Sequence, residues 1–160
     1  MAALGLPGAI AVFGNAVPIT LQTFGVMLVG SLLGARKGAL SMLVLLALVA
    51  AGLPLLAGGR GGLGVFAGPS VGYLLAWPIA AYVIGRIVEA GGPGYRWTRG
   101  LIANLVGGVA VIYALGIPLQ AWRTGVPLAE TAVLAAAFVP GDLVKAVLAT
   151  GVAGGVHRAM

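Results

Sequence analysis

Charged residues divide the chain into long apolar stretches. Three uncharged stretches are each long enough to hold one helix: 38–59, 61–85 and 100–122. A fourth stretch, 131–156, is interrupted only by Asp142 and Lys145. About 20 apolar residues in a helix cross a hydrocarbon core of roughly 30 Å. Each stretch therefore predicts one membrane-spanning helix, and the apolar residues 20–35 predict another.

Turn-forming residues punctuate the first part of the chain. Before residue 20, the helix-breaking signals are Gly5, Pro7, Gly14, Asn15 and Pro18. We expect a short or incomplete helix and a loop there; a secretory signal peptide is less favoured, because no positively charged segment begins the chain. The predicted fold class is all-α: a polytopic membrane helix bundle with five clear transmembrane helices plus this short or incomplete N-terminal helix. We expect residues 1–160 to form a single integral membrane domain.

The composition also indicates a protein that is surrounded by lipid. Hydrophobic residues make up 61% of the chain and charged residues 8%, against about 25% charged in an average soluble protein. Glycine occurs 28 times, and the four-residue spacing of Gly30, Gly34 and Gly38 predicts close helix packing within the bundle. Cysteine is absent, which excludes disulfides and thiolate metal sites. The single histidine, His157, gives no basis for a metal centre.

The net charge of +6 is spread along the chain. No basic patch with interleaved aromatic residues exists, so we predict no nucleic-acid partner. Six basic residues fall in turns on one predicted side of the membrane: Arg36, Lys37, Arg86, Arg96, Arg99 and Arg158. Arg60 and Arg123 fall on the other. The positive-inside rule makes the first side, with the C-terminus, cytoplasmic, and Trp77, Trp97 and Trp122 are candidate interfacial anchors.

Asp142 and Lys145 are the most informative residues. They lie in Phe138-Val-Pro-Gly-Asp-Leu-Val-Lys145, where Pro140 suits the first turn of a helix and Asp142 its positive dipole end. Three residues apart, they share one helix face. Because a charge at the membrane centre costs about 2.5–3.5 kcal/mol, such residues usually mark a functional site. The alternatives are a purely structural ion pair, or an Asp142 cap with Lys145 reaching outward to the interface.

A glycine-rich segment, 58–73, contains Arg60, Gly62 and Tyr73. Such a loop can fold back into the bundle and bring backbone amides close to a ligand. It lacks the Lys-Ser or Lys-Thr pair of a phosphate-binding loop, so we find no ATP site. Arg60 is either an anion-binding group or a solvated loop charge.

Neutral polar groups lie at the start of the helix 20–35. Thr20, Gln22 and Thr23 provide donors and acceptors for an uncharged polar group, or act simply as helix caps. No set of residues typical of a catalytic site is present, and we expect Glu89 and Glu130 in loops on opposite sides of the membrane. We therefore predict binding, with no catalytic residue and no metal.

Taken together, three segments closely resemble the BioY family, the biotin-binding S components of energy-coupling factor (ECF) transporters. They are Val17-Pro-Ile-Thr-Leu-Gln-Thr-Phe24, the glycine-rich segment with Gly72-Tyr73, and Phe138–Lys145. The resemblance implies a six-helix bundle in the bacterial inner membrane that captures biotin from outside. It implies an ECF transmembrane coupling subunit and two ATPase subunits as partners, dispensable in some members, with no cofactor in this chain.

The resemblance also implies roles for individual residues. Asp142 and Lys145 match the family's binding motif, and Tyr73 with the loop 58–64 matches the segment that lines the ligand. We expect the substrate-binding residues to be Asp142, Lys145, Arg60, Tyr73, Gln22 and Gly62, with Leu63 and Val65 against the apolar parts of biotin. Asp142 suits the ureido N–H groups, and Lys145 or Arg60 the carboxylate.

Rival hypotheses are an S component for another vitamin, a small membrane enzyme that uses Asp142 and Lys145, and a structural scaffold. Family members usually begin with a complete first helix, whereas the residues before Val17 are too few for one. In such proteins that helix commonly carries the small-residue surface that contacts the coupling subunit. We therefore expect this chain to dock less well to the coupling subunit.

Overall fold

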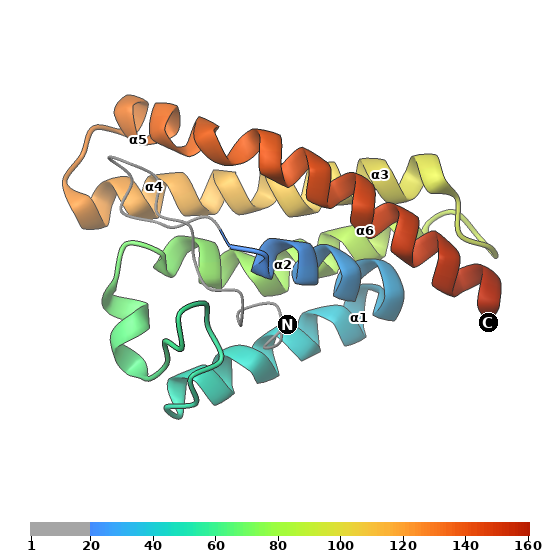
Figure 1. Cartoon of the computed structure of the whole chain (residues 1–160), viewed down its shortest axis with the longest axis horizontal. Helices are drawn as coiled ribbons and strands as arrows, with labels where there is room; N and C mark the ends of the chain where they lie inside the picture. Colours follow the sequence, from blue (N-terminus) through green and yellow to red (C-terminus); the bar gives the residue numbers. More distant parts are fainter. Residues whose placement is uncertain (1–19) are drawn as a thin grey trace.

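The computed structural model describes residues 20–160, and the expected N-terminal helix and loop lie outside the described residues. Helices dominate the described part (Figure 1) and confirm the predicted all-α class. The α-helices are α1 (Gln22–Ala50), α2 (Val71–Glu89), α3 (Trp97–Leu105), α4 (Ile112–Thr124), α5 (Leu128–Ala135) and α6 (Val139–Ala159). The shorter helical elements are Leu63–Ala67 and Ala136–Phe138, both 3-10, and the π-helical Val106–Val111.

Four helical runs among residues 20–160 are long and apolar enough to cross a membrane: Gln22–Ala50, Val71–Glu89, Trp97–Thr124 and Leu128–Ala159. The third run joins α3 to α4 through the π-helical segment, and the fourth joins α5 to α6 through the 3-10 turn. The first run doubles back on itself. The described residues therefore contain four candidate spans and not the five expected, because the expected helices 20–35 and 38–59 fall in the single element α1, which ends at Ala50.

The reversal within α1 occurs at Gly34. Its φ of 77° lies in the left-handed region that favours glycine, and Figure 1 shows the blue and cyan halves of α1 running in opposite directions. The side-chain Oε1 of Glu89 accepts a hydrogen bond from the Ala35 N–H at 2.8 Å, which satisfies a free amide at the start of the second half. Glu89 thus ends α2 and caps α1, a role that its expected loop position did not suggest.

Glycines set the spacing between the helices. Gly85 of α2 lies directly against the backbone of Gly34 and Ala35, and a Cβ on Gly38 would lie 3.3 Å from the Gly30 Cα. In the third run, Gly107 abuts α2. The absence of side chains at these positions lets backbones approach closely, which confirms the close packing predicted from the glycine spacing.

The last span begins earlier than Pro140. α6 itself starts at Val139, with Pro140 and Asp142 in its first turn as predicted, but the helical run already begins at Leu128. Pro140 lacks an N–H and its ring crowds the preceding turn, which accounts for the tighter 3-10 geometry of Ala136–Phe138. Asp142 consequently lies about four helical turns from Leu128. This depth disfavours the interpretation in which Lys145 reaches the interface.

The ends of the bundle differ in charge. The Gly34 turn, the end of α2, the start of α3 and the C-terminus gather at one end (Figure 1), where Tyr95 stacks on His157 at 5.0 Å. These segments carry the six basic residues that the sequence analysis placed on one side. At the opposite end, Arg123 donates to the Phe66 carbonyl at 3.4 Å. We call the first the basic end.

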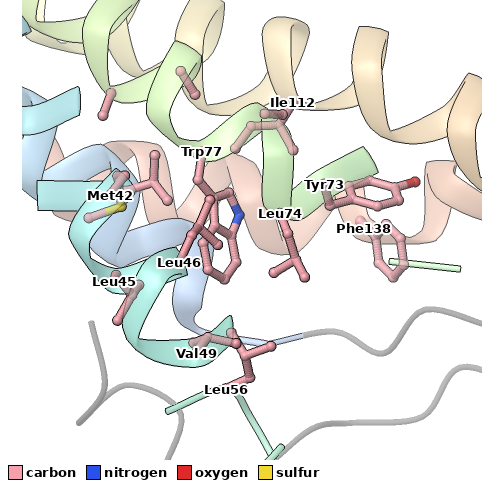
Figure 2. Packing of buried hydrophobic residues seen from close by; sticks show 14 of the residues in the cluster. Met42, Leu45, Leu46, Val49, Leu56, Tyr73, Leu74, Trp77, Ile112 and Phe138 are labelled. Carbon is pink, nitrogen blue, oxygen red and sulfur yellow. The ribbon is translucent and has the colours of Figure 1, made fainter. Parts of the chain in front are cut away.

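Trp77 corrects one expectation. Trp97 and Trp122 are exposed near helix ends, as interfacial anchors would be, but Trp77 is only 4% exposed. Figure 2 shows Trp77 packed in the core with Leu46 and Leu74. α2 contacts α1, α3 and α4, so a large side chain on its inward face is enclosed by protein and does not meet the interface.

We predict that Gly85→Ala destabilises the bundle by about 1–3 kcal/mol, the usual cost of overpacking. The added Cβ would collide with the backbone at the Gly34 turn, which cannot yield as a flexible side chain would. Thermal unfolding of the detergent-solubilised protein measures this. Gly151→Ala is the matched control, because no heavy atom lies within 4 Å of its Cβ position; an equal loss in both variants would contradict the prediction.

Candidate ligand-binding site

A cavity of about 60 Å³ lies toward the end of the bundle opposite the basic end. It brings together the three sequence segments that the resemblance singled out, together with α4. Its lining residues are Thr20, Gln22, Thr23, Arg60, Ser70, Tyr73, Leu74, Trp77, Ile112, Tyr113, Phe138, Asp142 and Lys145. Five of the six residues expected to bind substrate thus line one cavity, and the sixth, Gly62, does not.

An ion pair lies at the centre of this site. The Lys145 Nζ is 2.8 Å from the Asp142 Oδ1, and the two residues are 8% and 3% exposed. Nζ also donates to the Thr20 carbonyl at 2.7 Å and to the Thr23 Oγ1 at 3.0 Å. An ammonium group has three N–H donors, and each of these three contacts engages one. The charge of Lys145 is therefore well compensated by groups of the protein itself.

The carboxylate of Asp142 is equally well satisfied. The Tyr113 hydroxyl donates to its Oδ2 at 2.6 Å, and the Thr23 Oγ1 donates to its Oδ1 at 3.2 Å. The sequence analysis missed Tyr113. Its one signal was a hydroxyl in the middle of an apolar span, because a hydroxyl in lipid needs a partner.

Gln22 anchors the glycine-rich loop to the start of α1. Its Nε2 donates to the Leu55 carbonyl and its Oε1 accepts from the Ala57 N–H, both at 3.2 Å. The Arg60 Nε donates to the Ala57 carbonyl at 3.1 Å. Gln22 and Arg60 therefore hold the same stretch of loop at the mouth of the cavity.

The loop directly after Arg60 does not line the cavity. Gly62 adopts a φ of 81° and its N–H donates to the Val49 carbonyl at 2.7 Å, so it shapes the loop. Leu63 is exposed and Val65 packs against the core, and neither lines the cavity.

Tyr73 forms part of an aromatic wall. Its hydroxyl donates to the Gln120 Oε1 at 2.9 Å, and its ring meets Phe138 edge-on at 6.4 Å (Figure 2). The hydroxyl is thus satisfied within the protein. The ring of Tyr73 is left as an apolar surface toward the cavity.

Trp77 supplies a free donor. Its indole Nε1–H is buried and has no hydrogen-bond partner among the residues that the structure describes. Leaving a buried donor unsatisfied costs about 1–3 kcal/mol, and Trp77 lines the cavity. Sequence reasoning assigned Trp77 to the interface and so missed it. A ligand with a hydrogen-bond acceptor would relieve this cost.

These features define a multi-pass helical membrane protein with a small, charged cavity that contains a buried donor without a partner within residues 20–160. No group of three or more His, Cys, Asp or Glu side chains within residues 20–160 could hold a metal ion. The model of the BioY family matches residues 1–160, and the chain belongs to this family of transporters.

Named relatives agree with this assignment. The chain is 45% identical over 152 residues to "Biotin transporter BioY" of Rhizobium etli, covering 92% of this chain and 81% of the relative. It is 44% identical over 164 residues to "Probable biotin transporter BioY" of Bacillus subtilis, covering 100% and 86%.

A solved structure is also similar throughout. It is a crystal structure of the S-component for biotin from an ECF-type ABC transporter, 33% identical, with a TM-score of 0.94. The match covers 98% of this chain and 84% of the solved one. The resemblance stated from the sequence is thereby confirmed.

We predict that Tyr113→Phe lowers the free energy of unfolding by about 2 kcal/mol, because it removes a hydrogen bond to a buried carboxylate. Denaturant titration of the detergent-solubilised protein measures the loss. Tyr82→Phe is the control, since Tyr82 is exposed and forms no hydrogen bond within residues 20–160. Equal stability of the two variants would show that the Tyr113 contact contributes nothing.

Proposed function

We propose that this chain is the membrane subunit that captures biotin and delivers it across the membrane. The observation that carries the proposal is the meeting of the Asp142–Lys145 pair and the free Trp77 donor at one cavity. The names of the relatives and of the solved structure support biotin as the ligand. Biotin is the transported ligand and not a cofactor.

The chemistry of the lining suits the chemistry of biotin. The ureido ring has two N–H donors and a carbonyl acceptor, and the valerate chain ends in a carboxylate. Asp142 accepts from the ureido N–H groups, Trp77 donates to an acceptor oxygen, and Lys145 or Arg60 pairs with the carboxylate. The rings of Tyr73 and Phe138 offer apolar surface to the thioether ring and acyl chain.

Binding requires the cavity to widen. Its volume of about 60 Å³ is well below the roughly 300–1,000 Å³ of ligand pockets. One wall of the cavity is formed by the loop between Ala50 and Val71 and not by a long helix. Gln22 and Arg60 hold this loop in place. We infer that biotin displaces this loop. It also replaces some of the bonds between Lys145, Asp142 and Thr23.

Energy for transport comes from elsewhere. The sequence contains no phosphate-binding motif for ATP, so the proposed partners are an ECF transmembrane coupling subunit and two ATPase subunits. The ECF-type transporter from which the similar structure comes supports this assignment. The proposal includes no catalytic step, no metal and no nucleic acid.

The orientation follows from charge. The basic end carries six Lys and Arg residues, and the positive-inside rule places it in the cytoplasm. The C-terminus is then cytoplasmic and the biotin cavity opens to the outside of the bacterial inner membrane.

We predict that Asp142→Asn and Lys145→Met each weaken biotin binding roughly tenfold to a hundredfold, the range for a hydrogen bond to a charged group. Trp77→Phe should weaken it by about tenfold. Unlike Tyr113→Phe, it removes no hydrogen bond formed within residues 20–160. Equilibrium binding of tritiated biotin to the purified protein measures the affinities, with Leu63→Ala as an exposed control.

Three outcomes would redirect the proposal. Unchanged affinity in all three cavity variants would remove these residues from the site. Competition by thiamine or riboflavin at concentrations that match biotin would indicate another vitamin. Conversion of the bound ligand, where transport predicts its unchanged recovery, would indicate an enzyme.

The absence of native cysteine allows a direct test of orientation. Leu63→Cys, in the exposed loop near the cavity, should react with a membrane-impermeant maleimide in intact cells. Met160→Cys, at the exposed C-terminus, should react only after the cells are permeabilised. The reverse pattern would invert the proposed orientation.

A further inference from the structure

A second cavity lies at the basic end. Its volume is about 480 Å³, far larger than that of the first cavity, and the Gly34 turn and the last turns of α2 form its walls. Its charged lining residues are Arg36, Lys37, Arg86 and Glu89. Three cations and one anion leave a net charge of +2 on the lining.

The three cations have no carboxylate partner. Within residues 20–160 the single ion pair is Lys145–Asp142, and the Glu89 Oε1 is engaged by the Ala35 N–H. Arg36, Lys37 and Arg86 are all exposed. An arginine fork and a lysine ammonium beside each other make a suitable site for phosphate oxygens.

An apolar stripe leads into this cavity. Leu75, Ile79 and Tyr82 of α2 are 48%, 49% and 44% exposed, and Arg86 continues their spacing of three and four residues on one helix face. From Leu75 to Arg86 the helix rises about 16 Å. The hydrocarbon layer of one leaflet is about 15 Å, half of the bilayer core. The stripe therefore matches an acyl chain, and Arg86 lies at headgroup level.

We propose that this cavity binds the phosphate of an anionic phospholipid. Arg36, Lys37 and Arg86 hold the headgroup, and an acyl chain lies along Leu75, Ile79 and Tyr82. A free phosphate ion would use the same cations but not the stripe. Because the cavity joins the Gly34 turn to the end of α2, the bound lipid holds these two elements together at the membrane surface.

Native mass spectrometry of the purified full chain with phosphatidylglycerol and phosphatidylcholine tests the proposal. The wild-type protein should retain phosphatidylglycerol in preference. Each basic residue near an anionic headgroup contributes about fivefold in affinity, so Arg36→Gln/Arg86→Gln should bind it roughly thirtyfold more weakly. Arg96→Gln/Arg158→Gln is the matched control, because it removes two exposed charges from the same end but outside the cavity.

The outcomes separate specific binding from general surface charge. An equal loss in both double variants, or a loss in neither, would overturn the proposal. Displacement of phosphatidylglycerol by excess inorganic phosphate would assign the site to the free ion. Biotin binding should stay unchanged in Arg36→Gln/Arg86→Gln, which confirms that it folds. The single variant Arg86→Gln, with an expected loss of about fivefold, gives a second measurement.

Discussion

The buried pair of Asp142 and Lys145 is the interaction on which the end of the bundle opposite the basic end depends. Two unpaired charges at this depth would be prohibitive in lipid, so the surrounding elements must supply partners. Thr20 and Thr23 come from the start of α1 and Tyr113 from α4, while the pair itself belongs to α6. Three elements distant in sequence are thereby held at one point. Removing one partner of such a pair typically costs about 3–5 kcal/mol.

The basic end is held by contacts of a different kind. A buried chain of side-chain hydrogen bonds links Ser31 of α1 to Asn104 of α3 at 3.2 Å, and Asn104 to Thr150 of α6 at 3.0 Å. Gly85 packs against the turn at Gly34, whose following amide is capped by the carboxylate of the last residue of α2. These groups are neutral or engaged by the backbone.

Sequence patterns predicted the long apolar runs and most of the charged and polar residues that line the cavity, because charge in lipid is costly and therefore informative. Asp142 and Lys145 stand out for that reason. The sequence did not predict that Trp77 and Tyr113 line the cavity, because an aromatic residue in an apolar stretch can face either lipid or the protein core. The two environments differ little in polarity. The capping role of Glu89 depends on the reversal at Gly34, which brings Ala35 and Glu89 together although they are 54 positions apart. No short sequence pattern indicates such a contact.

Asymmetry between the ends has a consequence for the transport cycle. The contacts of the ion pair stabilise the narrow form of the cavity, while the buried Trp77 donor, which has no hydrogen-bond partner within residues 20–160, leaves a cost that a ligand can remove. A ligand that widens the cavity must exchange bonds at Thr20, Thr23 and the loop held by Gln22. The Ser31–Asn104–Thr150 chain contains none of those groups. Ligand binding should therefore rearrange the cavity end and leave the basic end as the fixed base against which the loop moves.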